Sequence, residues 1–469
     1  MRHLLRARTA FRTPSTRLAT GEGAARALQA PAGTMAHLSR QIGASSGLDP
    51  SLILPDKVVE RAGFAVGDRL DRRRERIAVK AVWALLVAGA AVLTASPAAA
   101  RERWSEAQAS GWYARQPWLV GSNYAPASAI NQLEMWQAAT WDPQRIDSEL
   151  ALAQGIGMNT MRVFLHDQLW AQDPEGFKRR IDEFLTIAHR HGIRPLFVLF
   201  DSCWDPDPKL GPQHPPIPGV HNSGWVQGPG MPGLRDRAGW PKYKSYVQGV
   251  IGAFKADDRI LGWDLWNEPD NPADQYKGQE GKEPLVRAML AQVFDWARAA
   301  DPTQPVTSGV WWHDDWSPSG GKLTPMEKLQ LGQSDVITFH DYSWPETFER
   351  RARQLIPYGR PVICTEYMAR GNGSTFDTIL PIGKRLNVGM INWGFVDGRT
   401  QTRLPWDSWK KPYTMDEPTI WFHEVFRADG TPYRRAETDL IRRLSAAPKG
   451  VVPPPPAEMP VVPARRARR

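Results

Sequence analysis

Residues 260–269 read Ile-Leu-Gly-Trp-Asp-Leu-Trp-Asn-Glu-Pro, a short apolar run that ends in a polar turn. A second run of this kind, Pro-Val-Ile-Cys-Thr-Glu at 361–366, also ends in a glutamate. Short runs rich in apolar, aromatic and β-branched residues are typical of buried strands. From Trp118 onward such runs alternate with amphipathic helical stretches, and this alternation predicts parallel βαβ units rather than a β-sandwich.

The sequence contains eight such units, which predict a single-domain α/β fold of the (β/α)₈ barrel type. Eight units in roughly 330 residues match the usual size of that fold with inserted loops, and its active sites lie at the carboxyl ends of the strands. Long loops are expected after strand three (201–240) and strand eight (395–423), and such loops usually bind ligands. We expect strands at 118–124, 159–165, 194–200, 260–266, 305–311, 335–340, 361–366 and 389–394. We expect helices at 144–154, 175–191, 241–255, 284–300, 345–355, 376–386 and 433–444.

Glu268 and Glu366 close the fourth and seventh predicted strands, so both should face the mouth of the barrel, the end where the strands finish. Hydrolysis of a glycosidic bond needs two carboxyl groups that face each other across the substrate. In the retaining mechanism they stand about 5–5.5 Å apart, one as nucleophile and the other as general acid and then base. Glu268 should then be held protonated and Glu366 ionised. No cofactor is expected.

The run Trp266-Asn267-Glu268-Pro269 resembles the acid/base signature of the clan A glycoside hydrolases. Over roughly residues 118–443 the chain is most similar to family five, the cellulase and mannanase family. The resemblance implies retaining hydrolysis of a β-linked glycan, with Glu268 as acid/base and Glu366 as nucleophile. It also implies that Asn267 binds the 2-hydroxyl of the sugar.

The same resemblance implies roles for four supporting residues. Arg162, at the end of strand two, supports the nucleophile, because a buried cation keeps a neighbouring carboxylate ionised. His340 and Tyr342 match a His-x-Tyr pattern in which the tyrosine hydrogen-bonds the nucleophile, and Trp393 matches the tryptophan that floors the catalytic subsite. The sequence departs from the family at the end of strand three, where a histidine is usual and Leu-Phe-Asp-Ser stands at 199–202.

Tryptophan is abundant, with 21 residues in the chain. Aromatic rings stack on sugars but also fill cores, and core packing is the better default for most of them. Besides Trp393, the candidates for sugar contact are those at predicted strand ends or in mouth loops: Trp204, Trp312, Trp344, Trp406 and Trp409.

Histidine and aspartate cluster at 313–315, and His214 and His221 lie in the strand-three loop. No spacing of metal ligands repeats, so polar loops without a metal are favoured. Cys203 and Cys364 fall on strands three and seven, on opposite sides of the barrel, so both are expected to be free thiols.

The formal net charge of +9 is concentrated at the two ends of the chain. Residues 1–80 carry 15 Lys and Arg against 7 Asp and Glu, and residues 446–469 carry 5 against 1, which leaves a mildly acidic body. A body without a basic face excludes nucleic acid as the expected partner.

The apolar run Ala-Val-Trp-Ala-Leu-Leu-Val-Ala-Gly-Ala-Ala-Val-Leu-Thr at 81–94 follows an arginine cluster and precedes Ser-Pro-Ala-Ala-Ala. This order is typical of a secretory signal, which we place at 71–100, and it predicts export to the periplasm or the cell exterior. Anchoring in a membrane through 81–94 is the lesser alternative, because a span needs about 20 residues. Residues 1–70 are expected to be a disordered extension or to precede the true start.

The predicted catalytic domain therefore covers 101–446, and a tail rich in proline and arginine follows at 447–469. The favoured activity is endo cleavage, by a monomer, of a β-linked polysaccharide of the mannan or glucan type. One alternative is an exo-β-glycosidase or transglycosylase. The other is an exported glycan-binding barrel without activity, which should have lost a catalytic carboxylate or Arg162.

Overall fold

The computed structural model describes residues 101–320 and 322–455. The expected extension at 1–70 and the expected signal at 71–100, with its possible anchor at 81–94, lie outside the described residues, as does the tail beyond 455. Among the described residues, no helix combines the length and the apolar character that crossing a membrane requires.

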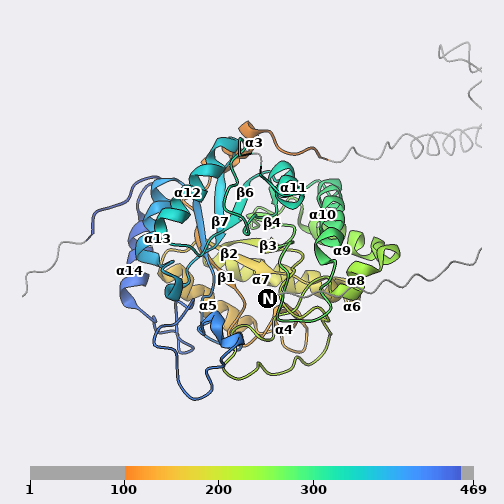
Figure 1. Ribbon diagram of the computed structural model, residues 1–469, viewed down its shortest axis with the longest axis horizontal. Helices are drawn as coiled ribbons and strands as arrows, with labels where there is room; N and C mark the ends of the chain where they lie inside the picture. Colours follow the sequence, from red (N-terminus) through yellow and green to blue (C-terminus); the bar gives the residue numbers. More distant parts are fainter. Residues whose placement is uncertain (1–100, 321, 456–469) are drawn as a thin grey trace, which may run out of the picture. The chain divides into compact units, whose positions relative to one another are not determined.

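Eight parallel strands form a barrel with helices around it (Figure 1), in the sheet order β5-β4-β3-β2-β1-β8-β7-β6. β5 and β6 stand at the two ends of this order and meet through a bridge between Val310 and Phe339. The bridge nearly closes the barrel and confirms the predicted (β/α)₈ fold. The strands are β1 (Val120–Tyr124), β2 (Thr160–Phe164), β3 (Arg194–Val198), β4 (Gly262–Asp264), β5 (Val306–Thr307), β6 (Ile337–His340), β7 (Val362–Glu366) and β8 (Gly389–Asn392).

Each observed strand lies within a predicted one, but β4 and β5 are shorter than expected. Regular pairing ends early there, although the Leu265 amide still donates to the Thr307 carbonyl at 2.7 Å. Beyond Asp264 the pairing continues through single contacts, such as the Asn267 amide donating to the Phe200 carbonyl at 2.8 Å, and this segment carries Glu268 to the mouth.

All seven predicted helices are present, with bounds that shift by at most two residues. These helices are α5 (Pro143–Gly155), α7 (Pro174–Arg190), α9 (Pro241–Phe254), α10 (Lys282–Ala299), α12 (Pro345–Leu355), α13 (Phe376–Arg385) and α14 (Arg435–Ala446). Two of them, α5 and α7, begin with proline after an aspartate cap, a combination that suits the unpaired amides of a helix start. The sequence did not predict α3 (Glu106–Ala114), α11 (Pro325–Gln333) between β5 and β6, or the short helices α4 (Gln132–Trp136), α6 (Asp167–Gln172) and α8 (Met231–Arg235).

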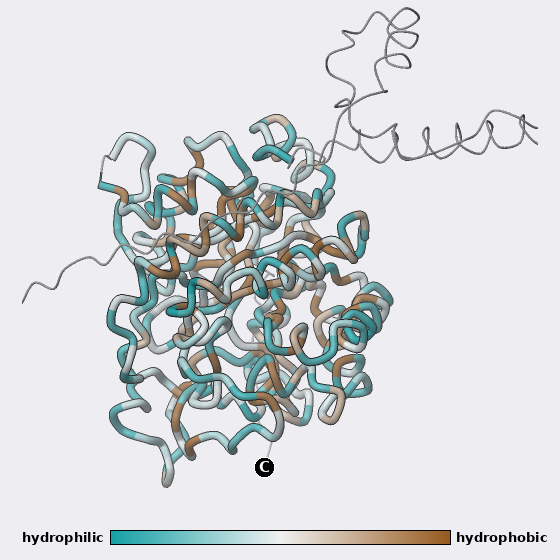
Figure 2. The backbone as a smooth tube through the Cα atoms, turned by 90° about the vertical axis from the view of Figure 1, so that its right-hand side faces the viewer, coloured by the Kyte–Doolittle hydropathy of each residue, from teal (hydrophilic) through white to brown (hydrophobic). Residues whose placement is uncertain are grey.

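The helix α3 (Glu106–Ala114) covers the end of the barrel opposite the mouth. Its Trp112 and Tyr113 pack against apolar residues near the starts of the strands: Leu119, Leu196, Leu261, Val336, Ile363 and Ile391. Lys449, at the start of the tail, donates to the Tyr113 carbonyl at 2.7 Å. Apolar segments run mainly through the interior and polar segments over the outside (Figure 2). With one end covered, the mouth is left for the functional site.

Both cysteines are free and buried, as expected. Cys364 lies within β7, whereas Cys203 lies beyond the end of β3 rather than on the strand. That displacement places the Cys203 thiol at the mouth, next to Glu268.

Candidate active site

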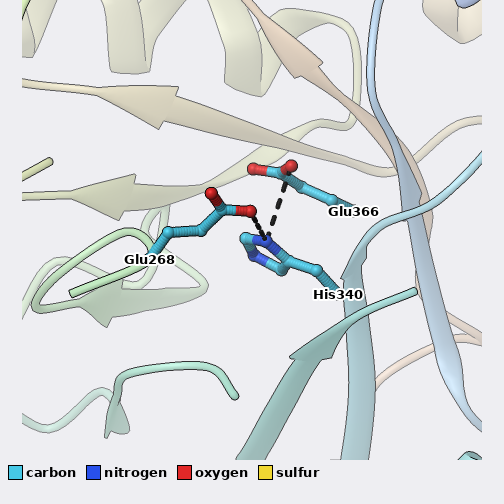
Figure 3. A group of neighbouring side chains, drawn as sticks. All are labelled: Glu268, His340 and Glu366. Carbon is cyan, nitrogen blue, oxygen red and sulfur yellow. Dashed lines mark hydrogen bonds and ion pairs between the residues drawn. The ribbon is translucent and has the colours of Figure 1, made fainter. Parts of the chain in front are cut away.

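Glu268 and Glu366 come together at the mouth, where both carboxyl groups approach His340 (Figure 3). The His340 Nδ1 atom lies 2.9 Å from Glu268 Oε1 and 3.5 Å from Glu366 Oε2. One oxygen of each carboxyl group and a ring nitrogen of His340 all lie within 4.8 Å of one another. The fold therefore assembles the carboxyl pair that the strand ends predict.

Glu268 is surrounded by neutral hydrogen-bond donors. Its Oε2 accepts from Asn271 Nδ2 at 2.6 Å and from the Cys203 thiol at 3.4 Å. Burial raises the pKa of Glu268, although these donors act in the opposite direction. Its backbone adopts a φ of 42°, a left-handed conformation uncommon for residues other than glycine. Burial therefore shifts the acid–base equilibrium of Glu268 toward its protonated form.

Glu366 has the stronger donors of the pair. Arg162 Nη1 donates to Oε1 at 2.8 Å, and the Tyr342 hydroxyl donates to Oε2 at 2.7 Å. Burial raises the pKa of Glu366 as well, and the Arg162 guanidinium and the Tyr342 hydroxyl act in the opposite direction. A guanidinium and a hydroxyl bound directly to the carboxylate make Glu366 the first of the two to ionise.

Arg162 is fully buried, and each of its five N–H groups has an acceptor. Nε and Nη2 bind Asp264 Oδ2 at 3.0 and 2.8 Å, and Nη1 also binds Asn123 Oδ1 at 2.9 Å. Burial alone would lower the pKa of Arg162, but the carboxylates of Asp264 and Glu366 raise it. The sequence reading did not assign Asn123 or Asp264, although a charged residue within an apolar strand was a usable signal for Asp264.

Asn267 links Arg162 to Asp201, which lies in the segment where the sequence departs from the family pattern. Its Oδ1 accepts from Arg162 Nη2 at 2.8 Å, and its Nδ2 donates to Asp201 Oδ1 at 2.9 Å. Asp201 also accepts a hydrogen bond from Trp225 Nε1 at 2.6 Å. Burial raises the pKa of Asp201 to about 6. Asp201, in the segment where the family usually has a histidine, therefore accepts hydrogen bonds from both Asn267 and Trp225.

His340 is buried between the two glutamates, and burial lowers its pKa to about 4. The ring is consequently neutral at neutral pH. A neutral imidazole nitrogen can accept a hydrogen bond from a protonated carboxyl group. His340 is thus suited to hold the protonated form of Glu268 in place.

A cavity of about 340 Å³ opens beside the carboxyl pair. Four of the five candidate tryptophans line it together with Trp393, whereas Trp344 is not among the lining residues. Trp225 and Trp311 also line it and were not singled out from the sequence. The aromatic lining consists of Trp204, Trp225, Trp311, Trp312, Tyr342, Trp393, Trp406 and Trp409. Such rings offer apolar faces to sugar rings.

Among the described residues, Glu268, His340 and Glu366 form the one group with the spacing of a metal site. Their ligand atoms already have hydrogen-bond partners in the protein. The other histidines considered above are held by protein groups: His214 by the Pro215 carbonyl at 2.7 Å, His221 by the Leu404 carbonyl at 2.8 Å and His313 by Glu327 at 3.1 Å. A reaction without a metal stays a prediction.

A (β/α)₈ barrel with paired glutamates at the ends of β4 and β7, beside an aromatic cavity, defines an O-glycosyl hydrolase acting on a β-linked glycan. The model of the cellulase family, glycosyl hydrolase family 5, matches residues 122–399. The chain belongs to glycosyl hydrolase family 5, as the sequence resemblance implied.

Several solved structures are similar to this chain. A β-1,4-mannanase from the sea hare Aplysia kurodai is 19% identical, with a TM-score of 0.43, and the match covers 59% of this chain and 87% of that chain. An exo-β-1,4-mannosidase from Opitutaceae bacterium strain TAV5 is 19% identical, with a TM-score of 0.49, and the match covers 70% of this chain and 59% of that chain. An endo-β-1,4-mannanase from Thermotoga petrophila is 16% identical, with a TM-score of 0.43 and coverages of 70% and 76%. A search of curated proteins finds no match.

Proposed function

We propose that this protein hydrolyses β-glycosidic bonds with retention of configuration, by double displacement through a covalent glycosyl-enzyme on Glu366. The supporting observation is that both carboxyl groups lie within 3.5 Å of His340 Nδ1. Retaining enzymes hold the two groups about 5–5.5 Å apart, whereas inverting enzymes need about 6.5–9.5 Å to admit a water molecule. The close approach of this pair favours direct attack by a carboxylate.

In the first step, Glu366 attacks the anomeric carbon while Glu268 gives its proton to the leaving oxygen. The bond to the leaving group breaks as the glycosyl–Glu366 ester forms. In the second step, ionised Glu268 takes a proton from water, whose oxygen attacks the anomeric carbon and releases Glu366. Glu268 ends protonated again, so the cycle is balanced without a cofactor.

The protein environment provides the two protonation states that this cycle needs at its start. Arg162 and Tyr342 stabilise the negative charge of Glu366. Burial raises the pKa of Glu268, which favours the protonated form that a general acid needs, although the charges of Arg162 and Lys282 act in the opposite direction. Asn267 lies between Arg162 and Asp201, which fixes its side chain for the expected contact with the sugar 2-hydroxyl.

The experiment that tests retention follows the anomeric configuration of the first product by proton NMR. Aryl β-mannosides, β-glucosides and β-xylosides serve as substrates, since the sugar preference is open and the proposed natural source is a mannan- or glucan-type chain. Retention predicts that the β-anomer appears first and mutarotates later. Early appearance of the α-anomer would show inversion and overturn the proposal.

We also propose that the protein is exported through the segment at 71–100, which has the order of charged, apolar and small residues of a secretory signal. Amino-terminal sequencing of the protein from its native host tests this directly. A mature start near residue 101 is expected. A start near Met1 contradicts the proposal.

A further inference from the structure

The cavity at the mouth is built unevenly around the catalytic pair. Its lining residues come from the segments that follow β3, β4, β5, β6 and β8, and from β7 itself. Within the described residues, none of the lining comes from β1 or β2 or from the loops directly after them. Something must therefore cover the mouth above those two strands.

The strand-three loop supplies that cover. Trp225 packs edge-on against Phe164 of β2, with ring centroids 5.1 Å apart, and against Trp393 after β8 at 6.1 Å. The Trp225 indole is held by Asp201 at 2.6 Å. The whole stretch 221–230 is buried, although loops normally run over the surface. This stretch forms a wall across one side of the mouth.

Hydrogen bonds fasten the wall to the strand-eight loop and to the segment after β1. The Asn222 amide donates to the Thr400 carbonyl at 2.9 Å, and the His221 amide donates to Ser408 Oγ at 2.9 Å. On the other side, Asn131 Nδ2 donates to the Gly224 carbonyl at 2.9 Å. Because backbone groups on both sides of the wall are paired, the wall is an integral part of the fold.

The opposite side of the cavity opens to solvent. The general acid stands beside the leaving-group oxygen, so the leaving group extends past Glu268. The cavity continues there along Asp274 and Gln275, which are both exposed, and along Trp312, of which 54% is exposed. A sugar chain attached through the leaving oxygen can leave the site in this direction.

We infer that the enzyme removes single sugars from the non-reducing end of β-linked chains. This inference rests on the proposed retaining function and departs from the endo action that the sequence favoured. Trp393 lines the cavity and is the tryptophan that the family resemblance places beneath the attacked sugar, and Trp225 stands directly against it. The wall thus begins where a further sugar on the non-reducing side of the attacked sugar would lie. Only a sugar at the non-reducing end of a chain therefore fits the site.

The decisive experiment uses the full chain and β-1,4-linked manno-, gluco- and xylo-pentaoses labelled at the reducing end. Stepwise shortening of the labelled chain by one sugar, with monosaccharide as the released product, is expected. Early labelled fragments of mixed lengths would overturn the inference while leaving the glycosidase proposal intact. Absence of hydrolysis on these chains and on the aryl glycosides would defeat both together, so the two failures are distinguishable.

A second measurement needs no variant. The substrate is a pentaose whose non-reducing end carries a further β-linked sugar analogue that resists cleavage. The enzyme should hydrolyse it at least about 100-fold more slowly than the unblocked pentaose, since small displacements at a reacting centre already cost about that factor. An endo-acting enzyme would cleave it internally at an unchanged rate, and that result would contradict the wall.

A variant pair tests the wall itself. Trp225→Ala should raise the share of products longer than one sugar, because it removes the ring that blocks the space on the non-reducing side of the attacked sugar. Trp344→Ala is the matched control, since Trp344 is 65% exposed and does not line the cavity. The inference fails if a folded Trp225→Ala protein, checked by circular dichroism, releases only single sugars at the wild-type rate.

Discussion

Arg162 donates from Nη1 to Oε1 of Glu366 at 2.8 Å, and both side chains are buried. The same guanidinium binds Asp264 and Asn267, so one residue of β2 joins the ends of β4 and β7. A buried charge keeps its place only when it is paired and fully hydrogen-bonded. The nucleophile is therefore positioned by the interior of the barrel and not by the mobile end of a loop.

Replacing Glu366 should stop turnover and replacing Glu268 should slow it severely, for different reasons. Glu366→Gln cannot form the glycosyl ester and should have no measurable kcat. Glu268→Gln loses general acid–base catalysis, so its kcat should fall by about 10²–10⁴. An aryl glycoside with a strongly activated leaving group needs no proton, and on this substrate Glu268→Gln should still show a burst of released phenol.

Steady-state and stopped-flow kinetics check this prediction. Glu175→Gln is the control, because the Glu175 side chain is 72% exposed on α7 and pairs with Lys178 on the surface. Near-normal turnover in either Glu268→Gln or Glu366→Gln would remove that residue from the mechanism.

Tyr342→Phe should move the acidic limb of the pH profile upward. The Tyr342 hydroxyl stabilises ionised Glu366, so its loss raises the pKa of Glu366, and the nucleophile then becomes protonated at a higher pH. A hydrogen bond to a charged group contributes about 1.5–3 kcal/mol, and about 1.4 kcal/mol corresponds to one pH unit. We expect a shift of the acidic limb of kcat/KM by about one unit or more.

The alkaline limb serves as the internal control in that experiment. It reports loss of the proton from Glu268, because activity falls as the pH rises through the pKa of the general acid. Tyr342 does not contact Glu268, so this limb should stay within a few tenths of a unit. A profile that loses height but keeps both limbs would assign Tyr342 a role in substrate binding instead.

The sequence predicted the barrel well because its signal is local. Each strand is a short apolar run, each helix repeats its apolar face, and Glu268 and Glu366 stand at strand ends that the fold brings to one mouth. The helix α11 was missed because it has only 9 residues and a weak apolar face. Local sequence patterns predict long helices and buried strands but give little information on short helices.

The supporting network was harder to predict because its partners are far apart in the chain. Asp264 binds Arg162, 102 positions away, and Asp201, just beyond β3, binds Trp225 in the long loop that follows. Such contacts depend on the strand register and on the path of the loop. The sequence shows that the segment at Asp201 departs from the family pattern. It does not show that Asp201 holds Trp225 of the wall through a hydrogen bond.

Asp264→Ala should destabilise the protein strongly. The substitution leaves the buried Arg162 with Glu366 as its remaining carboxylate partner and with two N–H groups unpaired. Breaking a buried ion pair on one side costs about 3–5 kcal/mol of unfolding free energy. Asp439→Ala is the control, because the Asp439 side chain is 53% exposed and pairs with Arg442 at the surface, where a salt bridge contributes about 0–1 kcal/mol. Urea unfolding followed by fluorescence measures both, and equal losses would contradict the structural role of Asp264.

Chelation should leave activity unchanged. Glu268, His340 and Glu366 are spaced closely enough to share a cation, and neutral His340 could ligate one. The mechanism, however, uses the proton of Glu268 and a carboxylate oxygen of Glu366 as the nucleophile, and a bound metal would occupy both groups. We therefore expect the same kcat/KM before and after dialysis against EDTA, with magnesium-saturated EDTA as the control for direct effects of the chelator.

Added zinc should inhibit, and the inhibition should weaken at low pH, where protons compete for the same atoms. Loss of activity on chelation that a divalent cation restores would show that the three residues form a working metal site and that the metal-free mechanism is wrong.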